Sequence, residues 1–223
     1  FEITKPEEGA YLAESLLEIK ALSDEKGLWY EIEGSVREYA ETEEYTKTFE
    51  LEDDFYSWKI AAYDRLGNRS KTTVLNFCID TEMPEEFEII PDVPSSIEKW
   101  RDTNDVTVEF GTTDATSGVE KYEYMLDGED WKECSSPLNL GVLEDGKHIL
   151  FVRAVDRAGN IRLETLEIYV DVTAPLSFEQ WSDIEAETWT SCNEPVLYFG
   201  TTDETSGVRN YTLSIDGAKE FDF

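Results

Sequence analysis

Carboxylates are the residues of this sequence whose chemistry stands out. The chain of 223 residues holds 51 Asp and Glu against 19 Lys and Arg, which gives a formal net charge of −32. Carboxylate oxygens suit a hard cation such as calcium, whereas a field of this sign repels phosphate backbones and anionic lipid headgroups. We therefore expect no nucleic-acid partner. No stretch approaches the ~20 apolar residues of a membrane span, so no membrane insertion of this segment is expected either.

The residue types and their spacing do not predict a catalytic site. The single histidine, His148, stands in line with Leu150 and Val152 on an alternating segment. A general base needs a partner and a cleft, and no Ser-His-Asp set is discernible. Pairs of carboxylates are too frequent in this chain to indicate a glycosidase, which places two of them across a cleft. We expect a structural role for His148 and no enzyme activity.

Internal repeats organise the chain. The segment FGTTDATSGV at 110–119 recurs as FGTTDETSGV at 199–208, and AAYDRLGN at 61–68 resembles RAVDRAGN at 153–160. Each of the last two is followed by a closing segment, DTEMP from Asp80 and DVTAP from Asp171. These offsets of about 90 residues fit sandwich domains of ~100 residues and exceed the period of solenoids. We place the first repeat at 1–83, the second at 84–174 and the third, which is incomplete, at 175–223.

The second repeat shows the pattern of β-strands. Apolar and polar residues alternate along 106–111, 120–126 and 148–155, which is typical of strands with one face on a core. The last of these segments places Leu150, Val152 and Ala154 on one face, and their counterparts in the first repeat are Trp58, Ile60 and Ala62. No long helical periodicity occurs. The pattern predicts an all-β fold built of sandwiches.

The repeats also bear on the cysteines, on the tryptophans and on the incomplete third repeat. The cysteines, Cys78, Cys134 and Cys192, fall one to a repeat at non-equivalent positions, which predicts free buried thiols and no internal disulfide. Trp100 and Trp189 are equivalent by repeat, which favours packing at the edge of a core over stacking on a sugar. A half sandwich leaves a core face open, so we expect later chain or a partner to complete the third repeat.

The second repeat carries an ordered pattern that runs from a Trp-x-x-x-Asn start to a closing Asp-x-Thr-Ala-Pro. Its residues are Trp100, Asn104, Asp114, Ser117, Gly118, Val119, Tyr122, Tyr124, Asp127, Gly128, Trp131, Gly146, His148, Ala154, Asp156, Gly159, Asn160, Asp171 and Pro175. In this pattern the second repeat resembles the bacterial immunoglobulin-like modules found in tandem in large secreted and surface proteins. The third repeat carries the first half of this pattern. The first repeat keeps only its end, and its divergent first half is nearer to fibronectin type III.

This resemblance implies tandem immunoglobulin-like β-sandwiches in an extracellular or cell-surface protein. The implied role is a non-catalytic spacer or stalk whose partners are further repeats of the same polypeptide. Two alternatives stay open: an adhesion or carbohydrate-binding module with a protein or glycan ligand, and an accessory region of a carbohydrate-active enzyme. Fold alone does not choose among them.

The topology of such a sandwich also suggests a calcium site. In it, the loops bearing Asp114 and Asp156 lie at the pole that faces the preceding domain, where the linker brings Asp80 and Glu82. Oxygen donors that converge in this way suit calcium, and calcium is the one cofactor considered. The alternative is that each Asp bonds the backbone of its own turn.

Overall fold

The computed structural model describes residues 1–92, 100–184, 189, 191, 194, 196–214 and 221–222. Every regular element among these residues is a β-strand, so the predicted all-β class is confirmed. The described residues accordingly include no apolar helix of membrane-spanning length. The chain clusters into two compact units. The first comprises Phe1–Ile89, Glu109–Leu138 and Leu150–Leu166, and the second comprises Ile90–Val108, Asn139–Ile149 and Glu167–Phe223.

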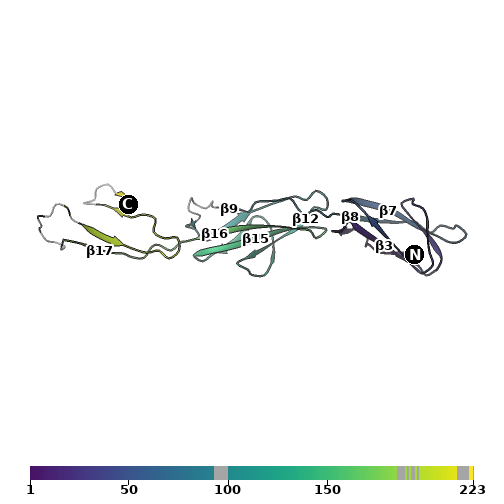
Figure 1. Ribbon diagram of the computed structural model, residues 1–223, viewed down its shortest axis with the longest axis horizontal. Coiled ribbons are helices and arrows are strands. Elements are labelled where there is room, and N and C mark those ends of the chain that lie inside the picture. Colours follow the sequence, from purple (N-terminus) through teal and green to yellow (C-terminus); the bar gives the residue numbers. More distant parts are fainter. Residues whose placement is uncertain are drawn as a thin grey trace. The chain divides into compact units, whose positions relative to one another are not determined.

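The first repeat forms a sandwich of two sheets within the first unit (Figure 1). One sheet has the order β1-β3-β6, with β1 at Glu2–Lys5, β3 at Leu16–Leu22 and β6 at Glu44–Glu50. The other has the order β2-β8-β7-β4-β5, with β2 at Ala10–Leu12, β8 at Thr73–Ile79, β7 at Asp54–Tyr63, β4 at Leu28–Ile32 and β5 at Glu38–Ala40. The pairing is antiparallel except between β2 and β8, which run parallel.

The core of this sandwich comes from the inward residues of both sheets. Ile19 on β3 and Ile60 on β7 are each 0% exposed and belong to one buried cluster. Ala62 lies in the same cluster, and Trp58 packs against it. Alternate residues of a strand face opposite sides of a sheet, so the alternation in sequence places these three residues of β7 on the core side. The predicted inward face of the first repeat is confirmed.

The strands of the second repeat also form two sheets. One has the order β10-β16-β15-β12-β13, with β10 at Trp100–Arg101, β16 at Ile161–Val170, β15 at Gly146–Asp156, β12 at Val119–Leu126 and β13 at Lys132–Cys134. The other has the order β14-β11-β9, with β14 at Leu138–Val142, β11 at Asp105–Glu109 and β9 at Ile90–Pro91. Strands β10 and β16 pair in parallel, as β2 and β8 do in the first repeat.

The predicted inward face of β15 is confirmed. Leu150, Val152 and Ala154 are each 0% exposed. They lie opposite Leu126, Tyr124 and Tyr122 of β12 in an antiparallel register. The register fixes where β15 ends, and its last residue, Asp156, begins the turn that leads into β16.

The described part of the third repeat holds two pairs of strands. Strand β17 at Glu179–Ser182 pairs with β18 at Leu197–Gly200, and β19 at Thr212–Leu213 pairs with β20 at Phe221–Asp222. The expectation that Trp189 packs at a core edge is wrong for this structure. Its side chain is fully exposed, whereas Trp100 is half-buried with its ring against the edge of Tyr169. Within the described part of the chain, Trp189 makes no ring contact like that of Trp100 with Tyr169.

Candidate metal centre

Asp80 directly follows β8 and is 0% exposed. Its backbone N–H donates to the carbonyl of Leu12 over 2.9 Å, which extends the parallel pairing of β2 and β8 by one residue. Its carboxylate accepts two backbone N–H groups, that of Ser117 at 2.9 Å and that of Glu82 at 3.2 Å. The end of the first repeat is thereby bonded to the loop that precedes β12.

Asp114 begins that loop and shapes it. Its Oδ1 accepts the N–H groups of Thr116 at 3.2 Å and of Gly118 at 2.7 Å. This is the local bonding by which an Asp side chain stabilises a turn. Gly118 closes the turn with a φ of +77°, in the left-handed region that favours glycine. The turn presents the Ser117 N–H outward to Asp80.

Asp156 plays the same part in the turn between β15 and β16, and it is 0% exposed. Its Oδ1 accepts the N–H groups of Gly159 at 2.6 Å and of Asn160 at 2.9 Å. Its Oδ2 accepts the side-chain amide of Asn160 at 2.8 Å. The same amide also donates to the carbonyl of Asp80 at 2.8 Å, so this turn too is bonded to the end of the first repeat.

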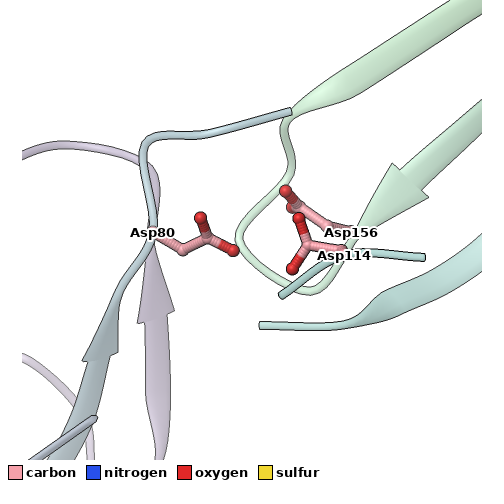
Figure 2. Close-up of side chains that lie close together, drawn as sticks. All are labelled: Asp80, Asp114 and Asp156. Carbon is pink, nitrogen blue, oxygen red and sulfur yellow. The ribbon is translucent and has the colours of Figure 1, made fainter. Parts of the chain in front are cut away.

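The three aspartates converge. Figure 2 shows Asp80 directed from the end of β8 toward Asp114 and Asp156, and one oxygen of each lies within 4.8 Å of those of the other two. The structure does not bring Glu82 into this cluster. Glu82 lies in the linker with its side chain exposed, and it contributes its backbone N–H to Asp80 in place of a carboxylate. Three of the four predicted ligands are therefore together.

Both interpretations of these aspartates find support in the geometry. Each carboxylate bonds backbone, as the structural alternative requires, yet the three negative charges remain close together. Among the residues that the structure describes, none of the three forms an ion pair. The nearby Arg157 donates to the carbonyl of Ser117 instead. Like charges at this separation repel, and a bound cation would relieve the repulsion.

The donor set is compatible with calcium. Each carboxylate oxygen has about two lone-pair sites, so the backbone bonds leave capacity at all three aspartates. Ser117 adds a hydroxyl that is buried and has no hydrogen-bond partner among the described residues. Calcium takes six to eight oxygen ligands and accepts irregular geometry, and water would complete the set. Calcium at this cluster stays a prediction.

Two residues of the linker after Asp80, Pro84 and Glu85, are also bonded to the second repeat. The carbonyl of Pro84 accepts Nε of Arg162 at 2.9 Å, and Pro84 itself is buried. The next residue, Glu85, donates its N–H to Thr113 at 2.9 Å and accepts the hydroxyl of Thr112 at 2.6 Å. Such a linker differs from a flexible chain, whose backbone bonds to water.

A second closing segment repeats this arrangement. Asp171 donates its N–H to the carbonyl of Arg101 at 3.0 Å, and its Oδ2 accepts the N–H of Ser206 at 3.0 Å. Asp203 shapes the loop around Ser206 by accepting the N–H of Gly207 at 3.0 Å. From sequence, Ser117, Asn160 and Asp171 are named only as residues of the family pattern and are not assigned to a junction between repeats. The offset of 89 residues between Ser117 and Ser206 is the signal that could have found this second set.

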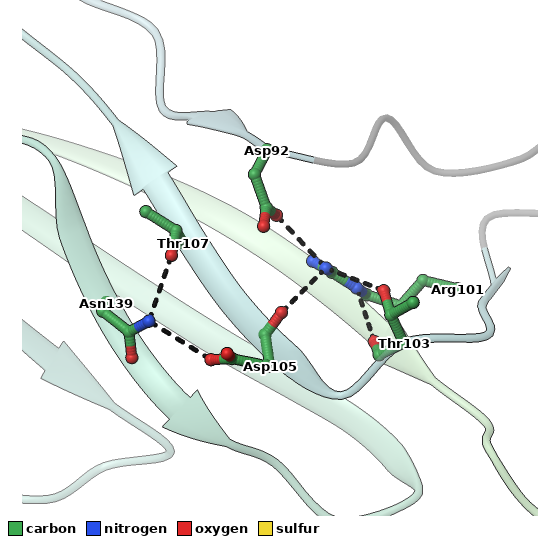
Figure 3. Close-up of polar contacts among 6 residues, drawn as sticks. All are labelled: Asp92, Arg101, Thr103, Asp105, Thr107 and Asn139. Carbon is green, nitrogen blue, oxygen red and sulfur yellow. Dashed lines mark hydrogen bonds and ion pairs between the residues drawn. The ribbon is translucent and has the colours of Figure 1, made fainter.

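A separate polar cluster surrounds Arg101 on β10, which is 5% exposed (Figure 3). Its guanidinium donates to the carbonyl of Thr103 at 2.8 Å and to that of Asp105 at 3.3 Å, and it pairs with Asp92 at 3.1 Å. Asn139 bonds both Asp105 and Thr107 at 3.2 Å. These contacts tie β10 to the start of β11, and we interpret the cluster as structural.

The other groups considered from sequence are structural as well. The buried Cys78 and the half-buried Cys134 are free thiols, and burial raises the pKa of each to about 11. Cys192 lies outside the described residues. His148 donates from Nε2 to the carbonyl of Glu144 at 2.8 Å, which holds its ring at the start of β15. A thiol with a raised pKa is a poor nucleophile at neutral pH.

Comparison with known proteins gives structural likenesses only. No family model and no curated protein matches the chain. The fibronectin(III)-like modules of Clostridium thermocellum CbhA are 15% identical with a TM-score of 0.49, over 76% of this chain and 93% of that one. A 1.5-MDa bacterial ice-binding adhesin is 14% identical with a TM-score of 0.37, over 94% and 88%. The D00-D0 domain of intimin is 11% identical with a TM-score of 0.32, over 75% and 98%.

Proposed function

We propose that this chain is a non-catalytic spacer or stalk segment of a large extracellular or cell-surface protein. The observation that carries the proposal is the bonding of Asp80, whose carboxylate and carbonyl accept donors from two loops of the second repeat. A spacer must transmit a fixed direction from one repeat to the next. A linker that is hydrogen-bonded to the next repeat at buried residues such as Asp80 and Pro84 does so, whereas a solvated one lets each repeat turn freely.

The physical basis of the stiffness lies in the cost of breaking these bonds. Asp80 is 0% exposed, so opening the linker exposes a buried carboxylate together with Ser117 and Pro84. A hydrogen bond to a charged group is worth about 1.5–3 kcal/mol, and the linker makes several bonds at once. The acidic surface, with a formal net charge of −32, favours solubility and keeps copies of the chain apart.

The stiffness can be measured by residual dipolar couplings in solution. We expect amide couplings from β3 and β7 and those from β12 and β15 to fit a single alignment tensor. The variant Asp80→Ala with Asn160→Ala removes donors and acceptors on both sides of the linker and should require two tensors. If the unchanged protein already requires two tensors, these strands reorient independently and the spacer proposal loses its basis.

We also propose that calcium binds Asp80, Asp114 and Asp156. What supports this is the 4.8 Å grouping of their oxygens and the buried hydroxyl of Ser117. Isothermal titration calorimetry should give heat at millimolar calcium that falls in Asp114→Ala and in Asp156→Ala. The matched control is Asp130→Ala, which removes an exposed carboxylate from another loop. Absence of heat at millimolar calcium would end this proposal and leave the spacer function standing.

One observation favours the adhesion or carbohydrate-binding alternative. Trp29 and Tyr39 lie side by side on β4 and β5, 40% and 41% exposed, with ring centroids 5.1 Å apart. Exposed aromatic rings are what sugar-binding surfaces use, although isolated exposed rings are also ordinary. Binding of a glycan that is lost in Trp29→Ala would favour this alternative over a pure spacer.

A further inference from the structure

We propose that the loop end of the first repeat, formed by residues 23–28 and 64–68, is a receiving site for the closing Asp of another repeat. This inference rests on the proposed spacer function. It identifies the partner of the first repeat as the closing segment of another repeat. The receiving loops of the second repeat are seen with such an Asp in place. The first repeat carries loops that share several of these bonds, and the corresponding donors have no acceptor among the described residues.

The loop at 23–28 matches the loop at 114–118. Ser23 Oγ accepts the N–H of Glu25 at 3.2 Å, just as Asp114 Oδ1 accepts that of Thr116 at 3.2 Å. Both loops close on a glycine with a φ of +77°, Gly27 in the first repeat and Gly118 in the second.

An arginine lies against each of these glycines. An added Cβ would meet Arg65 at 3.4 Å on Gly27, and Arg157 at 2.7 Å on Gly118. The backbone of the first loop is thus shaped to present an N–H at Lys26, where the second loop presents that of Ser117.

The turn at 64–68 matches the turn at 156–160. Asp64 Oδ1 accepts the N–H of Asn68 at 2.8 Å, and its Oδ2 accepts the Asn68 side-chain amide at 2.7 Å. Asp156 and Asn160 make the same two bonds at 2.9 and 2.8 Å. The Asn160 side-chain amide donates its second hydrogen to the carbonyl of Asp80. No such second acceptor contacts Asn68 among the described residues.

The number of residues between a closing Asp and the next Phe predicts where the Asp of a preceding repeat would lie. Phe87 lies seven residues after Asp80, and Phe178 lies seven residues after Asp171. Phe87 meets Tyr122 edge-on at 6.2 Å, and Phe178 meets Tyr211 edge-on at 6.0 Å.

Phe1 meets Tyr30 edge-on at 5.8 Å in the same way. Tyr30 and Tyr122 are equivalent, because each lies opposite an alanine of the partner strand, Ala62 and Ala154. An Asp seven residues ahead of Phe1 therefore reaches the receiving loops in the geometry seen twice elsewhere.

Two features of the first repeat are compatible with binding a preceding repeat. The Lys26 N–H has no acceptor among the residues that the structure describes. Leu66, at the tip of the 64–68 turn, is 89% exposed. Its counterpart Ala158 lines a pocket together with Pro6 and Leu17 of the first repeat. An apolar residue at this tip is thus suited to contact a preceding sandwich.

Charge also fits, with one difference between the two sites. Ser23 stands where the second repeat has Asp114, which removes one carboxylate, and Lys26 stands where it has Ser117, which adds a cation. The Lys26 ammonium is exposed and pairs with Glu43 at 3.8 Å. The occupant is therefore an Asp-x-x-x-Pro closing segment, as at 80–84 and 171–175. Its Asp carboxylate accepts the Lys26 N–H without a metal ion, and the carbonyl of the same Asp accepts the Asn68 amide.

The test adds a second copy of the closing segment 171–177 directly ahead of Phe1 in the full chain. This places its Asp seven residues before Phe1. The matched control carries the same addition with that Asp replaced by Ala. Hydrogen exchange of the Lys26 amide, read by NMR, should be at least about tenfold slower with Asp than with Ala, because a bond to a carboxylate protects it.

The outcomes separate this inference from the function on which it rests. Slower exchange at Lys26 with Asp, and not with Ala, supports the receiving site. Equal exchange in the two extended chains overturns it. If the Ser117 amide still depends on Asp80 in that case, only the receiving site fails. If the Ser117 amide is also independent of Asp80, the spacer proposal fails with it.

Discussion

Replacing Leu150 by alanine probes the core of the second repeat. Leu150 lies on β15 opposite Leu126 and is 0% exposed. The change removes three buried carbons, and at ~0.8 kcal/mol for each the transfer term is ~2.4 kcal/mol. The cavity left behind adds to this, because rigid strands relax only in part. We therefore expect Leu150→Ala to lower the free energy of unfolding by ~2–5 kcal/mol.

The assay is urea unfolding followed at individual amides of β12 and β15 by NMR, because repeats that unfold separately would blur a global signal. Lys147→Ala is the matched control on the same strand. Its side chain is 44% exposed and pairs with Glu167 at 2.7 Å, and an ion pair at an exposed site contributes little to stability. Equal shifts of the urea midpoint in the two variants would refute the assignment of the inward face.

Two further predictions concern the turn and the thiols. Gly118→Ala should destabilise by ~1–3 kcal/mol, because an alanine at a φ of +77° is strained and its Cβ would lie 2.7 Å from Arg157. Gly111→Ala, where nothing lies within 4 Å and φ is not left-handed, should change stability by less than ~0.5 kcal/mol in the same urea assay. With a pKa of about 11, Cys78 and Cys134 should react with iodoacetamide about 200-fold more slowly at pH 8 than an ordinary thiol, and faster as pH rises toward 11. Site-resolved mass spectrometry would show this, and rapid labelling at pH 8 would contradict it.

Much of the fold can be predicted from the sequence because the alternation of apolar and polar residues along a strand shows which residues face the core. Leu150, Val152 and Ala154 alternate with polar residues, and a strand with one face on a core has no other arrangement that buries them. The convergence of Asp80, Asp114 and Asp156 was predictable from the topology that the resemblance implies. In an immunoglobulin-like sandwich the loops bearing Asp114 and Asp156 lie at the pole that faces the preceding repeat, where the linker brings Asp80.

The sequence does not reveal which backbone N–H groups bond the aspartates. Ser117 is held by its N–H, and a backbone donor is not visible in a residue type. Glu82 was misplaced for the same reason, because the tight turn after Asp80 uses its N–H and leaves its carboxylate in solvent. Trp189 shows the limit of equivalence by repeat. Its counterpart Trp100 is half-buried against Tyr169 of β16, and a matching position in sequence does not supply that packing.

The central claim is that the closing Asp of one repeat holds a loop of the next. Hydrogen exchange of the Ser117 amide tests it most directly, because this N–H donates to Asp80 over 2.9 Å. In Asp80→Ala the amide loses a bond worth about 1.5–3 kcal/mol, so its exchange should accelerate about 10- to 150-fold. The Gly118 amide, which bonds Asp114 over 2.7 Å, should stay protected in the same sample. An unchanged Ser117 rate in Asp80→Ala would contradict the account.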